Sequence, residues 1–168
     1  MNYRIGLIAP YQELISKATK LASSKGISLT ACRAVLYEAV REAENMEQQG
    51  IDAIIVRETT DLYIEGKINI PVVPIRISGT DILKAFMKAR KISSKIALAN
   101  FYGRYKDISI IKGALDMDIP EFTFSTREEA YEGIKRLKEK VHVIVGGGLT
   151  CEIAIELGLR SVLIESTD

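Results

Sequence analysis

The chain has 168 residues, a formal net charge of +1 at neutral pH and a hydrophobic fraction of 47%, which is typical of a soluble globular domain. Its lysines and arginines are spread along the sequence, which excludes the basic stripe of a nucleic-acid binder, so we expect no direct nucleic-acid contact from this segment. Because no apolar stretch approaches bilayer length and the amino terminus lacks a signal-peptide pattern, we expect a cytoplasmic chain without membrane contact.

Predicted strands alternate with amphipathic helices along the whole sequence, a pattern typical of parallel sheets covered on both faces. The first part is predicted to contain strands 4–9, 27–31, 53–56 and 72–75, helices 12–25 and 37–49, and a short helix near Asp61. An apolar stripe should bury one face of the first helix: Leu14, Ile15, Ala18, Leu21 and Ala22. Glycines that follow helical stretches should adopt left-handed conformations: Gly26, Gly50 and Gly158.

The segment from Lys95 onward repeats the pattern of the first half at an offset of roughly ninety positions. We therefore predict an α/β fold of two similar Rossmann-like (flavodoxin-like) parallel-sheet lobes with a cleft between them, as in periplasmic binding proteins. The expected parts are a first lobe at 1–79, a connecting helix and hinge at 80–92, and a second lobe at 93–168. Chance similarity between two strand-and-helix arrays is the alternative.

Two local patterns mark helix starts in the later part of the chain. Ser78 precedes Asp81 by three residues, which predicts a capping box at the start of the connecting helix. The apolar strand near Val143 runs into three glycines, Gly146 to Gly148, and then into a helix predicted over 150–158. Unpaired N–H groups at such a helix start can hold an anion, but a tight turn without a ligand has the same pattern.

In open parallel sheets, ligands bind outside the carboxyl ends of the strands, so the loops at these ends are the candidate site. The predicted ligand-binding residues are Pro10, Arg57, Glu58, Thr59, Thr60, Ser78, Gly79, Asn100, Phe101, Gly146, Gly147, Gly148, Leu149 and Thr150. A guanidinium, several hydroxyls, an amide and a glycine-rich turn are typical of a receptor for a carboxylated ligand. A solvated or salt-bridged Arg57 is the alternative to a ligand contact.

The sequence patterns for catalysis are weaker than those for ligand binding, and we predict no catalytic residue, no metal and no cofactor. The single histidine, His142, lies within an apolar strand pattern and is expected to face the sheet or solvent. A racemase or isomerase of the aspartate/glutamate racemase type, with Cys32 and Cys151 as paired thiols, is a second hypothesis. The positive end of the helix that begins near Cys151 would favour a thiolate there, and the hypothesis requires both sulfurs to face one pocket. The alternative is that a lone cysteine is usually a small buried hydrophobe.

The segments 72–91, 95–99 and 143–159 together resemble the amino-terminal sensory domain of propionate catabolism activators. Those are cytoplasmic NtrC-like regulators that work with sigma-54 RNA polymerase. The resemblance implies a homo-oligomeric receptor joined to an ATPase module and a helix-turn-helix DNA-binding module, with 2-methylcitrate as the signal. Neither module is present in this sequence. The family pattern leads us to expect a further helix after Asp168, so the chain resembles an excised or truncated sensor.

One departure from the family pattern leaves the effector open. Where the family carries an arginine, two glycines and a threonine, this chain has Arg57, Glu58, Thr59 and Thr60. The negative charge of Glu58 would disfavour a tricarboxylate unless the side chain turns away or pairs with a cation. The expected mechanism is that a carboxylated metabolite closes the cleft and thereby controls the output modules.

A third hypothesis is that the domain only mediates self-association, through hydrophobic surface around Ile108, Ile111 and Leu115. The competing interpretation places these residues in the core.

Overall fold

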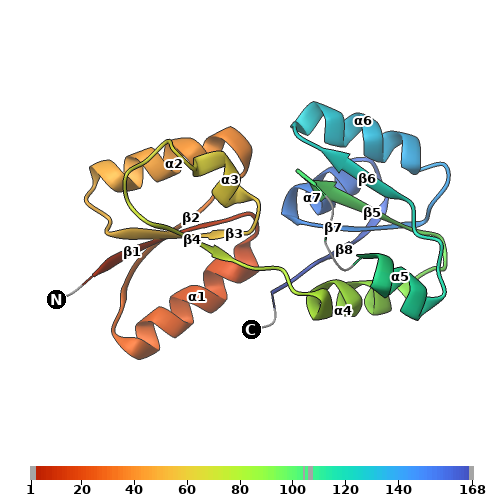
Figure 1. The fold of residues 1–168 in the computed structure, drawn as a ribbon, viewed down its shortest axis with the longest axis horizontal. Coiled ribbons are helices and arrows are strands. Elements are labelled where there is room, and N and C mark those ends of the chain that lie inside the picture. Colours follow the sequence, from red (N-terminus) through yellow and green to blue (C-terminus); the bar gives the residue numbers. More distant parts are fainter. Residues whose placement is uncertain (1–2, 104, 106–107, 167–168) are drawn as a thin grey trace. The chain divides into compact units, whose positions relative to one another are not determined.

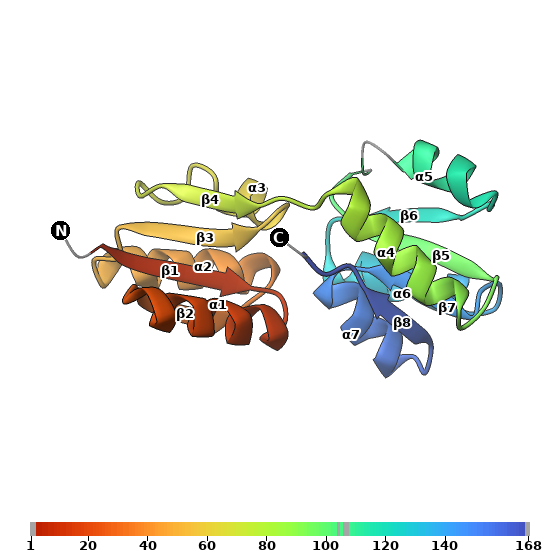
Figure 2. The same ribbon diagram turned by 90° about the horizontal axis from the view of Figure 1, so that it is seen from below.

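The computed structural model describes residues 3–103, 105 and 108–166, and these fall into two compact units. We call them the N-terminal unit, Met1–Arg76, and the C-terminal unit, Ile77–Asp168. Each unit contains a four-stranded parallel sheet with helices on both faces, as Figures 1 and 2 show. The predicted α/β class is therefore confirmed.

The N-terminal unit has the sheet order β2-β1-β3-β4. Its elements, in chain order, are β1 (Arg4–Ala9), α1 (Gln12–Lys25), β2 (Ser28–Arg33), α2 (Leu36–Gln48), β3 (Ala53–Arg57), α3 (Thr60–Ile64) and β4 (Val72–Ile75). Helix α1 covers one face of the sheet, whereas α2 and α3 cover the other (Figure 1). The side chains of Ile8 and Ile54 face α2, and Leu7 faces α1.

One side chain of the predicted apolar stripe on α1 is not buried. Leu14 and Ala22 are buried and Ala18 is half-buried, but Leu21 is 57% exposed. Because each helical residue turns by about 100°, a buried face centred on Ala18 and Ala22 leaves Leu21 at its margin.

The C-terminal unit has the sheet order β6-β5-β7-β8, which is the order of the N-terminal unit shifted by four strands. Its elements are α4 (Gly79–Arg90), β5 (Ile96–Phe101), α5 (Ile108–Leu115), β6 (Glu121–Phe124), α6 (Arg127–Leu137), β7 (Val143–Gly146), α7 (Gly148–Glu156) and β8 (Arg160–Leu163). The shared strand order is the repeat that the sequence pattern indicates.

Helices α4 and α5 contribute to one core of the C-terminal unit, on one face of its sheet. Phe86 of α4 and Leu98 of β5 are fully buried in this core. Helix α4 therefore packs within the C-terminal unit, and the division between the units falls at Arg76/Ile77. The hinge expected within 80–92 stays a prediction.

Helix α5 buries Ile108 and Ile111 in the same core, so these residues are not a surface for self-association. Leu115 is partly buried against that core.

The predicted helix ends agree with the backbone. Gly26, Gly50 and Gly158 have φ values of 65°, 76° and 70°, as left-handed residues after a helix should. The capping box at α4 is present, because the Ser78 hydroxyl accepts from the Asp81 N–H and the Asp81 carboxylate accepts from the Ser78 N–H. Among the described residues, no helix is long and apolar enough to span a bilayer.

Candidate functional site

The carboxyl ends of β1 and β3 form the switch point of the N-terminal sheet. The chain leaves β1 toward β2 on one side and returns to β3 on the other side, so the loops after β1 and β3 diverge there. Ligands of open α/β sheets bind in the crevice that such diverging loops leave. Pro10 and Tyr11 follow β1, and Arg57 is the last residue of β3.

Arg57 is buried at this switch point, with only 5% of its surface exposed. Its guanidinium donates a hydrogen bond to the Tyr11 hydroxyl at 3.1 Å and lies 5.9 Å from the centre of the Tyr11 ring. This burial excludes a solvated Arg57, and the ligand contact stays a prediction. Contact with the tyrosine fixes the guanidinium near the start of α1, for which Tyr11 is the N-cap residue.

The loop after Arg57 carries charge and backbone strain. The Glu58 carboxylate lies 3.5 Å from the Arg76 guanidinium, so this side chain has a cationic partner. Thr59 has a φ of 82°, a conformation that is costly for a β-branched residue, and its N–H donates to the Asp61 carboxylate at 2.9 Å. Thr60 begins α3. Tyr11, Asp61 and Arg76 are not among the predicted ligand-binding residues, although each lies within a few residues of a predicted strand end.

The C-terminal sheet has its switch point between β5 and β7, the strands that correspond to β1 and β3. Asn100, near the end of β5, is 5% exposed, and its amide nitrogen lies 3.4 Å from the Gly103 carbonyl oxygen that accepts from it. The Phe101 ring packs against Tyr102 and Phe124, with ring centres 5.6 and 5.7 Å apart. An amide and aromatic rings line this side of the switch point.

The glycine-rich turn lies on the other side of the same switch point. Gly146 is tightly enclosed, because a Cβ there would lie 2.5 Å from the Ala99 carbonyl oxygen. Gly147 is the N-cap residue of α7, has no side chain to cap the helix, and has open space where a Cβ would be. The first N–H groups of α7 are therefore without a side-chain cap at an accessible position, which suits an anion.

Helix α7 begins at Gly148, two residues before its predicted start. Gly147 has extended backbone angles, so the turn is complete there and the third glycine is already helical. The Thr150 hydroxyl donates to the Ala99 carbonyl at 3.1 Å and Leu149 is buried, so both side chains hold α7 against the sheet.

Two further predicted site residues, Ser78 and Gly79, begin α4. The Ser78 hydroxyl is engaged by the capping box, since it lies 2.8 Å from the Asp81 carboxylate as well as accepting from the Asp81 N–H. Helix capping accounts for these hydrogen bonds without a ligand. Within each unit, the remaining predicted residues converge on the switch point of its own sheet.

Both cysteine thiols are held in the protonated form. Burial, together with a smaller contribution from the negative charge of Glu42, raises the pKa of Cys32 to about 11. Burial likewise raises the pKa of Cys151 to about 11, against a smaller lowering by a hydrogen bond from Ser161. The thiolate that the racemase hypothesis expects at Cys151 is therefore disfavoured by burial. His142 is exposed and its Nδ1 lies 3.1 Å from the Ser93 hydroxyl.

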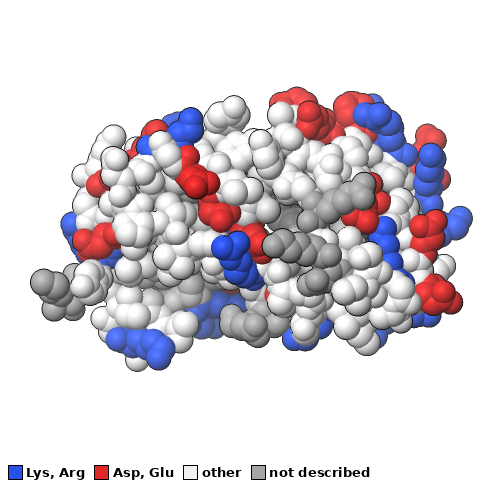
Figure 3. Space-filling model, viewed as in Figure 1, with Lys and Arg blue, Asp and Glu red and all other residues white. Residues whose placement is uncertain are grey.

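Charged groups of both signs are interspersed on the face shown in Figure 3. Within the described ranges, no group of three or more His, Cys, Asp or Glu side chains could hold a metal ion.

Comparison with known proteins identifies the relatives of this chain. A structure described as an NtrC family transcriptional regulator from Clostridium acetobutylicum matches with a TM-score of 0.89 and 29% identity, over 100% of this chain and 90% of that chain. An ABC transporter solute-binding protein from Conexibacter woesei matches with a TM-score of 0.50 and 12% identity, over 98% and 72% of the two chains, and shows the fold alone. The family profile described as propionate catabolism activator matches residues 24–168. The chain therefore belongs to the propionate catabolism activator family and corresponds to the amino-terminal domain of its regulators.

Proposed function

We propose that this sensing domain of a transcriptional regulator recognises a small carboxylated metabolite at the switch points of its sheets. The observation that carries the proposal is the accessible start of α7, where Gly147 leaves the helix without a side-chain cap. Arg57, at the corresponding strand end of the N-terminal unit, supports it, because a guanidinium can bind a carboxylate through two hydrogen bonds. The 2-methylcitrate that the family resemblance implies is one candidate ligand.

The charges near Arg57 favour a ligand with fewer carboxylates than 2-methylcitrate. Arg57 and Arg76 supply two positive charges, and Glu58 and Asp61 supply two negative charges, so this group is formally neutral. A tricarboxylate would meet repulsion from Glu58 that a ligand with one or two carboxylates meets less strongly. We expect such smaller acids to bind more tightly than citrate or 2-methylcitrate.

Calorimetric titration of the 168-residue chain with mono-, di- and tricarboxylates tests the proposal. Arg57→Gln should weaken binding of the best acid at least about tenfold, which corresponds to about 1.4 kcal/mol. Arg41→Gln, at an exposed position of α2, is the matched control and should bind normally. If no acid binds, the proposed function is wrong, and if the Arg57 variant binds as well as the control, Arg57 is not part of the site.

A second variant tests the start of α7 without weakening the fold. Gly147→Asp places a carboxylate where Asp is a preferred cap, and neither its backbone angles nor its surroundings oppose a side chain. The new carboxylate should occupy the helix start, keep stability at or above the original value, and lower affinity for acids at least about tenfold by occupation and repulsion. Gly147→Ala adds a Cβ without a charge and should retain binding.

Arg57→Gln and Gly147→Asp test the strand-end sites of the two units separately. Loss of binding in only one of the two variants would assign the acid to the unit that carries that substitution.

We propose further that binding controls ATPase and helix-turn-helix DNA-binding modules that act with sigma-54 RNA polymerase. In a full-length regulator, Gly147→Asp should remove the response of a sigma-54-dependent reporter to the acid and leave its basal level unchanged. Measuring the mass of the domain in solution with and without the acid tests whether the expected homo-oligomer responds to the ligand.

A further inference from the structure

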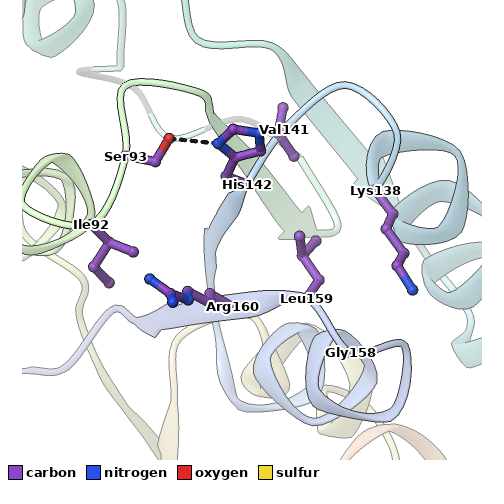
Figure 4. A pocket seen from close by; sticks show the side chains of 8 residues that line it. All are labelled: Ile92, Ser93, Lys138, Val141, His142, Gly158, Leu159 and Arg160. Atoms are coloured by element: carbon purple, nitrogen blue, oxygen red, sulfur yellow. Dashed lines mark hydrogen bonds between the residues drawn. The ribbon is translucent and has the colours of Figure 1, made fainter.

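A second concave site lies in the C-terminal unit at the amino-terminal edge of its sheet. The pocket has a volume of about 460 Å³, within the range of small-molecule sites. Figure 4 shows that its lining comes from the segment after α4, the C-cap of α6, the turn after α7, the two residues before β7 and the first residue of β8. The predicted ligand residues of this unit at β5 and β7 lie at the opposite edge, about 13 Å away along a four-residue strand.

Hydrogen-bonding side chains stand around this pocket. The Ser93 hydroxyl and the His142 Nδ1 are 3.1 Å apart, and the Ser93 hydroxyl also accepts from the Lys95 N–H at 3.1 Å. The Lys138 ammonium donates to the Leu157 carbonyl at the carboxyl end of α7. This contact offsets the negative end of that helix, which would otherwise repel an anion.

Arg160, the first residue of β8, contributes the second cation (Figure 4). Within the described residues, Arg160 has no carboxylate partner, and the pocket lining contains no carboxylate. Its backbone is fixed by pairing of β8 with β7 at Val143, so the base of the side chain has a defined position. Arg160 therefore offers a guanidinium that the fold itself does not neutralise.

The floor of the pocket is apolar. Val141 and Leu159 are 4% and 7% exposed, and Ile92 at the rim is 41% exposed although it is a large hydrophobic side chain. A fully charged, compact anion such as phosphate would leave this floor unused. An anion that also carries an apolar chain would meet both parts of the lining.

We infer that this pocket is a binding site for an amphipathic monocarboxylate, with its carboxylate at Arg160 and its aliphatic chain against Ile92, Val141 and Leu159. The inference is independent of the proposed function, because none of these residues belongs to the strand-end site. The ligand class follows from a guanidinium without a carboxylate partner among the described residues, which suits one carboxylate, and from the apolar side chains at the floor and rim of the pocket.

Hexanoate is the probe, and backbone amide NMR shifts of the isotope-labelled 168-residue chain are the measurement. Saturating shifts are expected at Ser93, His142 and Arg160, with hexanoate binding at least about tenfold more tightly than acetate because of its extra methylene groups. Hexylamine, which has the same chain and the opposite charge, should produce no saturating shift at these residues.

Arg160→Gln should weaken hexanoate binding about fivefold, the upper range for a partly solvated ion pair. Arg136→Gln, at an exposed arginine of α6 outside the pocket, is the matched control and should leave affinity unchanged. Absence of saturation, equal binding of hexylamine, or an unchanged Arg160→Gln affinity would each overturn the inference. Shifts confined to Gly147 and Thr150 would also overturn it while supporting the strand-end site.

Discussion

The two units share one strand order but differ in chemistry at the corresponding strand ends. In the N-terminal unit, β3 ends in Arg57 and continues through a charged and strained loop. In the C-terminal unit, β7 ends in Gly146 and continues through glycines that can offer only backbone groups for hydrogen bonding. The repeated topology is set by buried strands and helix faces, so the loops at the strand ends can differ without changing the sheet.

The largest expected effect is the loss of stability caused by opening a cavity in the core of one unit at a time. Ile8→Ala in the N-terminal core and Leu98→Ala in the C-terminal core each remove a fully buried side chain and should cost about 2–5 kcal/mol. Since each residue packs within its own unit, amide hydrogen exchange should accelerate mainly in the unit that carries the substitution.

Leu21→Ala is the control for these cavity variants, because its side chain is 57% exposed and its loss should change stability by less than about 0.5 kcal/mol. If both units lose protection from amide hydrogen exchange equally after either core substitution, they unfold as one cooperative body. The expectation that each unit is stabilised by its own core would then be wrong.

Substitution of two adjacent glycines in the turn after β7 should cause different, and smaller, losses of stability. Gly146→Ala would place a Cβ 2.5 Å from both the Ala99 carbonyl oxygen and the Thr150 methyl carbon, and should cost about 1–3 kcal/mol through overpacking. Gly147→Ala meets nothing within 4 Å and should be close to neutral. Urea unfolding followed by far-UV circular dichroism measures the difference, and equal stability of the two variants would contradict the enclosed position of Gly146.

A glycine in the loop after β3 would make that loop resemble the glycine-rich turn after β7, and we expect it to stabilise the N-terminal unit. Thr59→Gly removes a β-branched side chain from a φ of 82° and should stabilise the N-terminal unit by about 0.5–1 kcal/mol, after the entropy cost of glycine. The melting temperature of that unit should rise by a few degrees. Thr60→Gly, at the first residue of the short helix α3, is the control and should not stabilise. A lower melting temperature for Thr59→Gly would show that side-chain contacts of Thr59 outweigh its backbone strain.

Most of the fold could be predicted from the sequence because periodicity and helix-ending glycines act locally. The bounds of β1, α1 and β4 agree with the predicted ranges, and the Ser78 capping box follows from residues three positions apart. The start of α7 was placed two residues late, because the pattern of three glycines does not show which of them is helical.

The site depends on contacts between distant residues, which local patterns do not specify. Arg57 was predicted as a ligand contact, but its hydrogen bond to Tyr11 spans 46 positions and depends on the pairing of β1 with β3. The partner of Glu58 likewise depends on where β4 places Arg76. Sequence spacing locates such residues at strand ends and leaves their side-chain partners undetermined.

Ionisation of the two thiols, one in each unit, is expected to change stability least near neutral pH. With pKa values raised to about 11, only about one in a thousand Cys32 or Cys151 thiols is ionised at pH 8. Because the folded-state pKa lies above the unfolded value, burial of the thiols stabilises the fold fully below pH 9, and this contribution is lost as pH rises through 11.

Alkylation by iodoacetamide, followed by mass spectrometry, should therefore be slow at pH 8 and accelerate toward pH 11 at both positions. Unfolded chain in urea is the control, since its thiols should react rapidly already near pH 9. Rapid alkylation of folded Cys151 at pH 8, with Cys32 unreactive, would mean that the start of α7 stabilises a thiolate. The C-terminal unit would then hold a nucleophile beside its glycine-rich turn, and a thiolate at Cys151 would support the two-thiol hypothesis.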